Sequence, residues 1–163
     1  GACPELLVKG ALEFSRSRRR FMQALHAGPR TLVHHDCHAG NLYWSDGRPG
    51  LLDWQLARAG EGIGDVAYLL ATSLQPEDRR THERELVELY GSELKASGVH
   101  GIESAQLWSR YQLHLVYPLE AMLMTRAMGG LMPVDINDTS ISRAANAVAE
   151  HDSFKLLARA AER

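Results

Sequence analysis

Three side chains between positions 33 and 53 have the types and the spacing needed to bind magnesium and to orient a hydroxyl group. Asp36 is followed five positions later by Asn41, and Asp53 ends a second short apolar segment. Mg²⁺ prefers hard oxygen ligands and is commonly held by one or two carboxylates together with phosphate oxygens. Asp53 could supply the carboxylate and Asn41 a neutral amide oxygen, while Asp36 could take the proton of an acceptor hydroxyl. The pattern therefore indicates phosphoryl transfer.

A β-hairpin is expected to position two of these residues. Apolar strands are predicted at 42–44 and 50–52, joined by Ser45-Asp46-Gly47-Arg48-Pro49, which is rich in turn-forming residues. A connection of that length folds the second strand back along the first. Asn41 would then lie beside Asp53, as a shared metal site requires.

The same residues resemble a known superfamily. The run from Leu32 to Asn41 resembles the L-V-H-G-D-L-H-P-G-N signature of the aminoglycoside phosphotransferase and choline kinase superfamily. Leu52-Asp53-Trp54-Gln55 is similar to the metal loop of its ecdysteroid-kinase-like and bacterial phosphotransferase branches, and the run from Gly64 to Leu70 matches the G-x-x-D-L-A-Y-L-L segment that follows. The resemblance implies ATP-dependent transfer of phosphate to a hydroxyl of a small molecule, with Mg²⁺ as cofactor.

The resemblance also implies a role for each motif residue. Asp36 would be the catalytic residue, with Asn41 and Asp53 as the metal ligands. Asp65 would be structural and tie the next helix to the catalytic loop, while His34 is expected to support the loop backbone. Two further residues are candidate contacts to substrate or phosphate, His38 and Gln55, and the other interpretation of His38 is that it packs within the loop.

The signature is modified at two positions. His35 replaces the usual glycine before the catalytic aspartate, and Cys37 replaces an apolar residue after it. Glycine tolerates unusual backbone angles, so His35 is expected to adopt a conformation that is costly for a side chain. Cys37 is expected to be a small buried apolar residue.

Two other functions fit parts of the sequence. The cluster His34-His35-Asp36-Cys37-His38 contains zinc-ligand types and suggests a metal-dependent hydrolase. Adjacent residues on one loop cannot all face one ion, however, and no second Cys/His cluster occurs. The alternative from another class is a non-catalytic binding module on a kinase-like scaffold, against which the intact set of Asp36, Asn41 and Asp53 argues.

The part of a kinase that covers the nucleotide is not evident in the sequence. About thirty residues precede the catalytic loop, and there is no G-x-G-x-x-G or V-A-I-K-like segment. The only lysines, Lys9, Lys95 and Lys155, lie on no strand-like run. We therefore expect residues 1–163 to form the single C-terminal lobe of a kinase-like phosphotransferase, with residues 31–65 as its catalytic and metal-binding core. Its partner would be the N-terminal lobe of the same polypeptide, and alone it should bind ATP weakly.

The expected fold is mainly α (α+β), a helical bundle with a small β-hairpin that carries the catalytic and metal loops. Apolar periodicity and Gly or Pro stops predict helices at 4–26, 65–74, 76–97, 103–128 and 140–161. The fourth should bend near Pro118, and the last should break near His151-Asp152.

Composition is that of an ordinary globular domain. The 163 residues are 45% hydrophobic and 23% charged, and the net charge of -2 argues against nucleic acid as the main partner. No apolar run is long enough to span a bilayer, and we expect no signal peptide. The two cysteines, Cys3 and Cys37, provide no disulfide framework, which favours a cytoplasmic location.

Soft apolar side chains are concentrated where the resemblance places the acceptor substrate. They can be core residues, since Met fills gaps well, or they can line a pocket for an acceptor less polar than an aminoglycoside. No dense acidic wall for a polycation is evident. The side chains are Trp108, Tyr111, Tyr117, Met122, Met124, Met128 and Met132.

Overall fold

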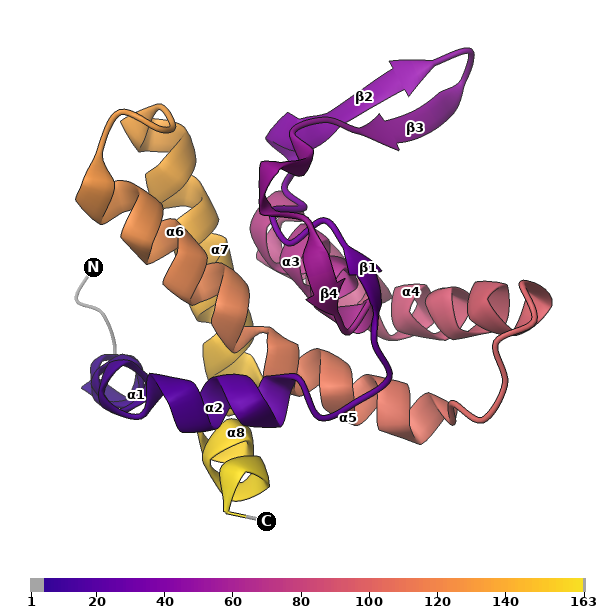
Figure 1. Ribbon diagram of the computed structural model, residues 1–163. Helices are drawn as coiled ribbons and strands as arrows, with labels where there is room; N and C mark the ends of the chain where they lie inside the picture. The colour runs from indigo at the N-terminus through magenta and orange to yellow at the C-terminus, as the bar shows by residue number, and fades with distance from the viewer. Residues whose placement is uncertain (1–4, 163) are drawn as a thin grey trace.

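The computed structural model in Figure 1 describes residues 5–162, apart from the side chain of Leu6. The predicted mainly helical fold with a small hairpin is confirmed. Cys3 and the expected helix start at Pro4 lie outside the described residues. The elements are α1 (Glu5–Arg16), α2 (Arg18–Leu25), β1 (Thr31–Val33), η1 (Ala39–Asn41), β2 (Leu42–Ser45), β3 (Arg48–Leu51), η2 (Trp54–Leu56), β4 (Arg58–Gly60), α3 (Ile63–Ser73), α4 (Pro76–Ala96), α5 (Ser104–His114), α6 (Val116–Met128), α7 (Val134–Glu150) and α8 (Ser153–Ala161), where η1 and η2 are short 3₁₀ turns.

The predicted hairpin forms with a tighter turn than expected. Strands β2 and β3 pair antiparallel, with Leu42 opposite Leu51 and Ser45 opposite Arg48. The connection is the two residues Asp46 and Gly47, whose φ angles of 50° and 75° are both positive. Asp-Gly is favoured in such two-residue turns because their twist matches that of the strands. The expected five-residue connection was therefore wrong, since its outer residues belong to the strands.

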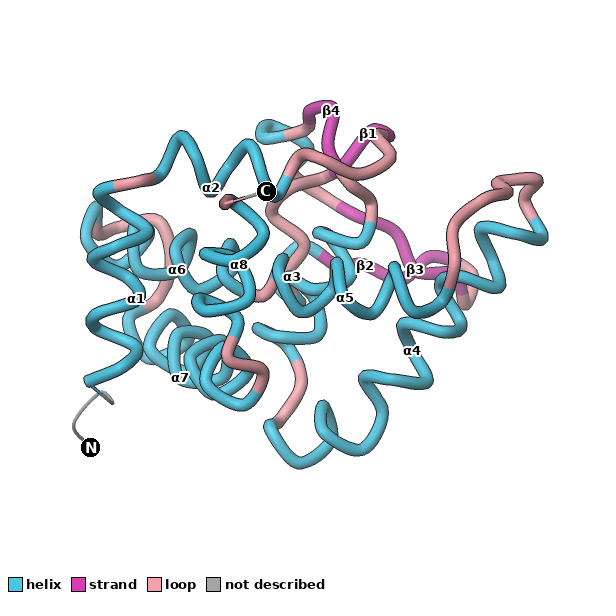
Figure 2. The backbone as a smooth tube through the Cα atoms, turned by 90° about the horizontal axis from the view of Figure 1, so that it is seen from below, coloured by secondary structure: helices cyan, strands magenta, loops and turns pink. Residues whose placement is uncertain are grey.

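A second small sheet was not predicted. Strand β1 pairs antiparallel with β4, and Val33 lies opposite Arg58. A Cβ at Gly60 would meet Cγ2 of Val33 at 2.9 Å, so the close approach of β4 to the Val33 side chain depends on glycine. The three residues of β4 carry no alternating pattern, which is why the sequence did not reveal the strand. The sheet closes the chain between Val33 and Arg58 into one loop that contains the hairpin (Figure 2).

Three of the long predicted helices are divided, and the division of the first was not predicted. The first is two helices, α1 and α2, that meet at Ser17, between the buried rings of Phe14 and Phe21. These rings stack with centroids 5.7 Å apart, which joins the two helices. The predicted bend near Pro118 separates α5 from α6 at Leu115. Proline lacks an N–H and its ring crowds the carbonyl four residues earlier, so the bend precedes it.

The last helical segment starts earlier than predicted. Helix α7 begins at Val134, directly after Pro133, and not at Ser140. Proline before or at the first helical residue is favourable because the first N–H groups have no partner inside the helix. The predicted break at His151 and Asp152 is confirmed, and Asp152 has a φ of 51° there.

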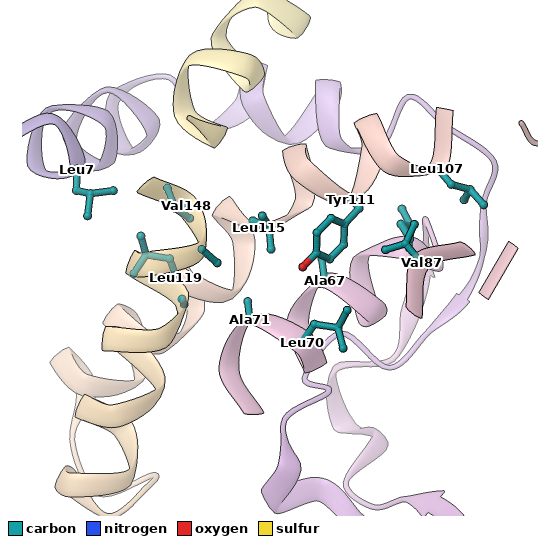
Figure 3. Close-up of a cluster of buried hydrophobic side chains, with 13 residues drawn as sticks. Leu7, Ala67, Leu70, Ala71, Val87, Leu107, Tyr111, Leu115, Leu119 and Val148 are labelled. Atoms are coloured by element: carbon teal, nitrogen blue, oxygen red, sulfur yellow. The ribbon is translucent and has the colours of Figure 1, made fainter. Parts of the chain in front are cut away.

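Helix α3 lies at the centre of the hydrophobic core. Its Ala67 and Ala71 are fully buried among side chains that include Tyr111 and Leu115 (Figure 3). Small residues at these two positions let the neighbouring helices approach α3 closely, as dense packing requires. No helix within residues 5–162 has both the length and the apolar character needed to cross a membrane.

A buried carboxylate joins α2, α5 and the start of α3. Glu61 accepts hydrogen bonds from the backbone N–H of Gly28 at 2.5 Å and from Nε of Arg110 at 2.8 Å. Arg110 also donates to the carbonyl oxygens of Ala24 and Leu25 at the end of α2. Burial alone would raise the pKa of Glu61, but the ring of His114, whose Nε2 is 3.4 Å from the carboxylate, and the hydrogen bonds from Arg110 outweigh it and hold the pKa below its ordinary value.

A second buried cluster joins α4, α5 and the α7–α8 break. Arg79 contacts Glu83 at 2.6 Å and also pairs with Glu150. The hydroxyl of Tyr111 donates to Glu83 at 2.8 Å, and Nε2 of His151 lies 2.9 Å from the same carboxylate. The turn at His151 is therefore held by buried polar contacts as well as by local backbone geometry.

We predict that Glu61→Ala lowers the free energy of unfolding by about 3–5 kcal/mol, because it leaves the partly buried Arg110 without its counter-ion. Urea denaturation of the 163-residue protein and of the variant measures this change in the free energy of unfolding. Glu88→Ala is the matched control, since Glu88 forms an exposed pair with Arg84 and should cost less than about 1 kcal/mol. Equal losses in the two variants would contradict the role given to the buried pair.

Candidate active site

Most of the residues singled out from the sequence meet at one large cavity. It has a volume of about 1240 Å³ and lies between the loop that follows β1, the helix α3 and the pair α6 and α7. Figure 1 shows α6 and α7 side by side, across from the base of the hairpin. Five of the seven predicted site residues line this cavity: Asp36, His38, Asn41, Asp53 and Gln55. His34 and Asp65 do not line it and support the loop instead.

Both oxygens of the Asp36 carboxylate have a donor. Tyr68 donates its hydroxyl to Oδ1 at 2.8 Å. Asn41 donates its amide nitrogen to the backbone oxygen of Asp36 at 2.9 Å and to Oδ2 at 3.3 Å. The carboxylate is thereby held in one orientation at the cavity wall, which is what a group that must meet a reacting hydroxyl needs.

Tyr68 was not identified from the sequence as a site residue. Burial, and next the charge of Asp36, raise the pKa of Tyr68, so that it stays protonated and acts as a donor. Its ring is 1% exposed. Helical spacing could have identified Tyr68 from the sequence, because it follows Asp65 by three positions and shares its face of α3.

Helix α3 holds the loop at three points. The carboxylate of Asp65 accepts hydrogen bonds from the backbone N–H groups of His34, at 2.7 Å, and of His35, at 2.9 Å. One turn along the helix Tyr68 binds Asp36, and near the helix end Ser73 Oγ accepts from the N–H of Ala39 at 3.0 Å. The loop geometry is therefore set by a rigid helix.

His34 links the two loops of the site. Its Nδ1 accepts from the N–H of Asp36 at 3.3 Å, and its Nε2 lies 2.6 Å from the carbonyl oxygen of Leu52. The two contacts agree with one tautomer, in which Nε2 carries the proton and donates. The ring is buried and meets Trp54 edge to face at 4.8 Å. His34 thus joins the loop that carries Asp36 to the one that carries Asp53.

The hairpin places Asn41 and Asp53 at its open end. The N–H of Leu52 donates to the carbonyl oxygen of Asn41 at 2.8 Å, one position beyond the paired strands. Asp53 has a φ of 58°, a left-handed conformation that aspartate tolerates better than most residues. Gln55 donates to Oδ2 of Asp53 at 3.3 Å.

The donor set at this end suits Mg²⁺. Asn41 uses its amide nitrogen toward Asp36, so its amide oxygen is the atom available to a cation. Within residues 5–162 no three His, Cys, Asp or Glu side chains are grouped to hold a metal. One carboxylate and one amide oxygen still fit magnesium, which is usually completed by phosphate oxygens and water.

His38 lies beside Asp36 on the cavity wall. Its Nδ1 accepts from the N–H of Gly40 at 3.1 Å and so caps the turn η1, while Nε2 is 3.8 Å from Oδ2 of Asp36. A Cβ at Gly40 would meet the His38 ring at 2.8 Å, so the turn depends on glycine. His38 is positioned to meet a molecule bound at Asp36.

The His34–His38 cluster does not converge on a common point. His34 is bound to the loop backbone, and His35 stacks on Tyr117 with centroids 4.1 Å apart. Cys37 is buried beside Tyr68 and Met122, as expected, and burial followed by the charges of Asp65 and Asp36 raises its pKa to about 12. Side chains that face different partners do not form a zinc site, which argues against the hydrolase hypothesis.

His35 adopts the costly backbone conformation expected from the sequence. Its φ is 70°, a value that glycine accepts and other residues rarely adopt. The Tyr117 hydroxyl, 3.4 Å away, donates to the His35 carbonyl oxygen, and the stacked rings hold the side chain. Burial, and next the charge of Arg58, lower the pKa of His35 to about 3. The ring is therefore neutral near pH 7.

We predict that His35→Gly is nearly neutral for stability at pH 7 and stabilising, relative to the unmodified protein, at pH 5. Glycine removes a backbone cost of about 1–2 kcal/mol but loses a ring stack of similar worth. Below about pH 6.5 the unfolded state binds a proton at His35 that the folded state, with a pKa of about 3, does not. The unmodified protein therefore loses stability as pH falls.

Urea denaturation at the two pH values measures this difference, which should grow by on the order of 1–2 kcal/mol. His100→Gly, at an exposed loop histidine, is the control and should show a constant difference. A His35→Gly difference that stays equal at pH 7 and pH 5 would contradict the assignment of a neutral, stacked ring.

Comparison with known proteins gives one family match. The sequence model of the phosphotransferase enzyme family matches residues 4–110, which include the loop after β1, the hairpin and helices α3 and α4. Searches of curated proteins and of solved structures returned no significant match. The match covers more than half of the chain and includes every predicted site residue. The chain therefore belongs to the phosphotransferase enzyme family.

Proposed function

We propose that the chain is the helical catalytic lobe of an ATP-dependent O-phosphotransferase that acts on a hydroxyl of a small molecule. The main observation in support is Asp36, whose two carboxylate oxygens are both held by donors at the wall of a large cavity. The same cavity is lined by Asn41 and Asp53, which suit magnesium. Phosphoryl transfer needs this combination of positioning and charge neutralisation more than covalent catalysis.

Asp36 would orient the acceptor hydroxyl and accept its proton as the oxygen attacks phosphorus. Tyr68 and Asn41 keep the carboxylate facing the cavity, so the proton acceptor needs no rearrangement when substrate arrives. Asn41 and Asp53 would hold Mg²⁺, which when bound with ATP neutralises phosphate charge. His38, 3.8 Å from Asp36, would contact the acceptor or the transferred phosphoryl group.

The residues beneath the loop act by positioning. Asp65 fixes the backbone of His34 and His35, and His34 fixes the distance between the loops of Asp36 and Asp53. The loop and lysine that cover nucleotide phosphates in related kinases are not found in the 163 residues. We propose that a β-rich lobe of the same polypeptide supplies them.

We expect Asp36→Asn to reduce kcat by about 10²–10⁴-fold with little effect on Mg·ATP affinity, because only the proton acceptor is lost. Asp53→Ala should instead weaken Mg²⁺-dependent nucleotide binding. Steady-state kinetics and titration calorimetry, on the kinase with both lobes, measure the two effects. Asp46→Asn, in the hairpin turn and outside the cavity, is the control and should change neither.

Two results would refute this division of roles. Loss of nucleotide affinity in Asp36→Asn as severe as in Asp53→Ala would place Asp36 on the metal. The second result is that the unmodified protein binds its ligands fully without measurable phosphotransfer and that Asp36→Asn binds them equally well. That result would favour the non-catalytic binding module.

We expect Tyr68→Phe to reduce kcat by about 10- to 100-fold, the effect of losing one hydrogen bond to a charged group. KM for ATP should stay unchanged, because Tyr68 contacts Asp36 and not the metal residues. The matched control is Tyr90→Phe, at a half-buried tyrosine of α4 that does not line the cavity. Equal kcat for Tyr68→Phe and the unmodified enzyme would show that Asp36 does not depend on this donor.

A further inference from the structure

The end of α6 and the start of α7 expose an unusual number of apolar side chains. We call residues 123–136 the α6–α7 tip. Met128 is 64% exposed and Leu131 is 65% exposed, although large apolar side chains are normally buried. The exposed apolar residues of the tip that also line the cavity of Asp36 are Leu123, Met124, Met128, Leu131 and Ile136.

The tip is well supported by contacts on its other sides. The side chain of Asn137 is buried and donates to the carbonyl oxygen of Met122 at 3.1 Å, which joins α7 to α6. Arg126 pairs with Asp138 at 2.9 Å across the same two helices. Gly129 and Gly130 make the reversal with φ angles of 69° and 73°. The apolar side chains are therefore exposed on a braced helical hairpin, not on a frayed end.

The charges around the cavity do not suit a polycation. Apart from Asp36 and Asp53, the carboxylates that line it are Glu120 and Asp135. Glu120 already pairs with Arg18, with contacts of 2.9 and 3.4 Å. Arg143, which also lines the cavity, adds a second positive charge. The cavity is thus lined by four carboxylates and two arginines. On the proposed function Asp36 faces the hydroxyl and Asp53 the magnesium ion, and Glu120 is paired, so only Asp135 is left for an ammonium group.

We propose that the α6–α7 tip binds the apolar body of the acceptor and presents its single hydroxyl to Asp36, so that the substrate is a lipophilic alcohol. Ligand pockets are mostly apolar with a few placed polar groups, which describes this cavity. Methionine is flexible and polarizable, so Met124 and Met128 can adapt to an irregular apolar surface. The tip lies outside the residues that the family match covers, and the match therefore leaves the acceptor open.

The position of the tip favours a small ligand over a protein partner. Its apolar side chains line the same cavity as the carboxylate, and a protein surface would have to enter that cavity to cover them. Phosphorylation of the hydroxyl rests on the proposed function, whereas binding of the apolar body to the tip does not. Binding and phosphotransfer can therefore be tested separately.

The test is equilibrium dialysis of the chain against radiolabelled 1-decanol. We expect saturable binding that is weakened at least tenfold in Met128→Glu and in Leu131→Glu. Both side chains are exposed, so the folded state should tolerate the change, and an unaltered melting temperature confirms it. Leu89→Glu is the matched control, since Leu89 is 53% exposed on α4 and does not line the cavity.

Three outcomes of the dialysis would overturn the inference. These outcomes are no saturable binding of decanol, equal binding by the tip variants and Leu89→Glu, or tighter binding of kanamycin than of decanol. A change of oligomeric state confined to the tip variants would make the tip an interface between copies. Decanol binding at the tip without phosphotransfer in the complete kinase would refute the proposed function and leave the inference standing. Phosphotransfer to a polar acceptor without decanol binding would refute the inference and leave the proposed function standing.

Discussion

The site depends on the hydrogen bonds by which one face of helix α3 holds the loop that contains Asp36. Asp65 accepts two backbone hydrogen bonds from the loop before Asp36, and Tyr68 fixes the carboxylate of Asp36 itself. A loop alone would leave these groups free to move, whereas a helix holds them at a fixed spacing along its axis. The hydrogen bond between His34 and Leu52 carries the same constraint to the loop that contains Asp53. The positions of Asp36, Asn41 and Asp53 thus follow from α3.

Helix α3 can hold the loop because it is itself held on all sides. Its small residues Ala67 and Ala71 are fully buried, and the helices around it are joined by the buried clusters of Glu61 and of Arg79. Buried charges are costly to desolvate, and they persist only where each has its partners. These clusters therefore specify how the helices are arranged, while apolar packing provides most of the stability.

The cavity has two walls of different physical character. One is polar and rigid, made by the loop, the hairpin end and α3, and it suits a reaction that needs fixed charges. The other is apolar and includes flexible methionines, and it suits recognition of shape without many directed contacts. On the proposed function, chemistry and acceptor choice would fall to separate parts of the chain, and the apolar part could vary without disturbing the geometry around Asp36.

The sequence by itself determined the residue types of the site, the hairpin between Asn41 and Asp53, and most helices, because these depend on local spacing and turn chemistry. It also indicated the strained backbone at His35, since a glycine position was occupied by a larger residue. Strand β4, the contact of Tyr68 with Asp36 and the buried partners of Glu61 were decided only by the tertiary structure. Each joins segments far apart in the chain, and a pairing of that kind leaves no periodic signal in either segment.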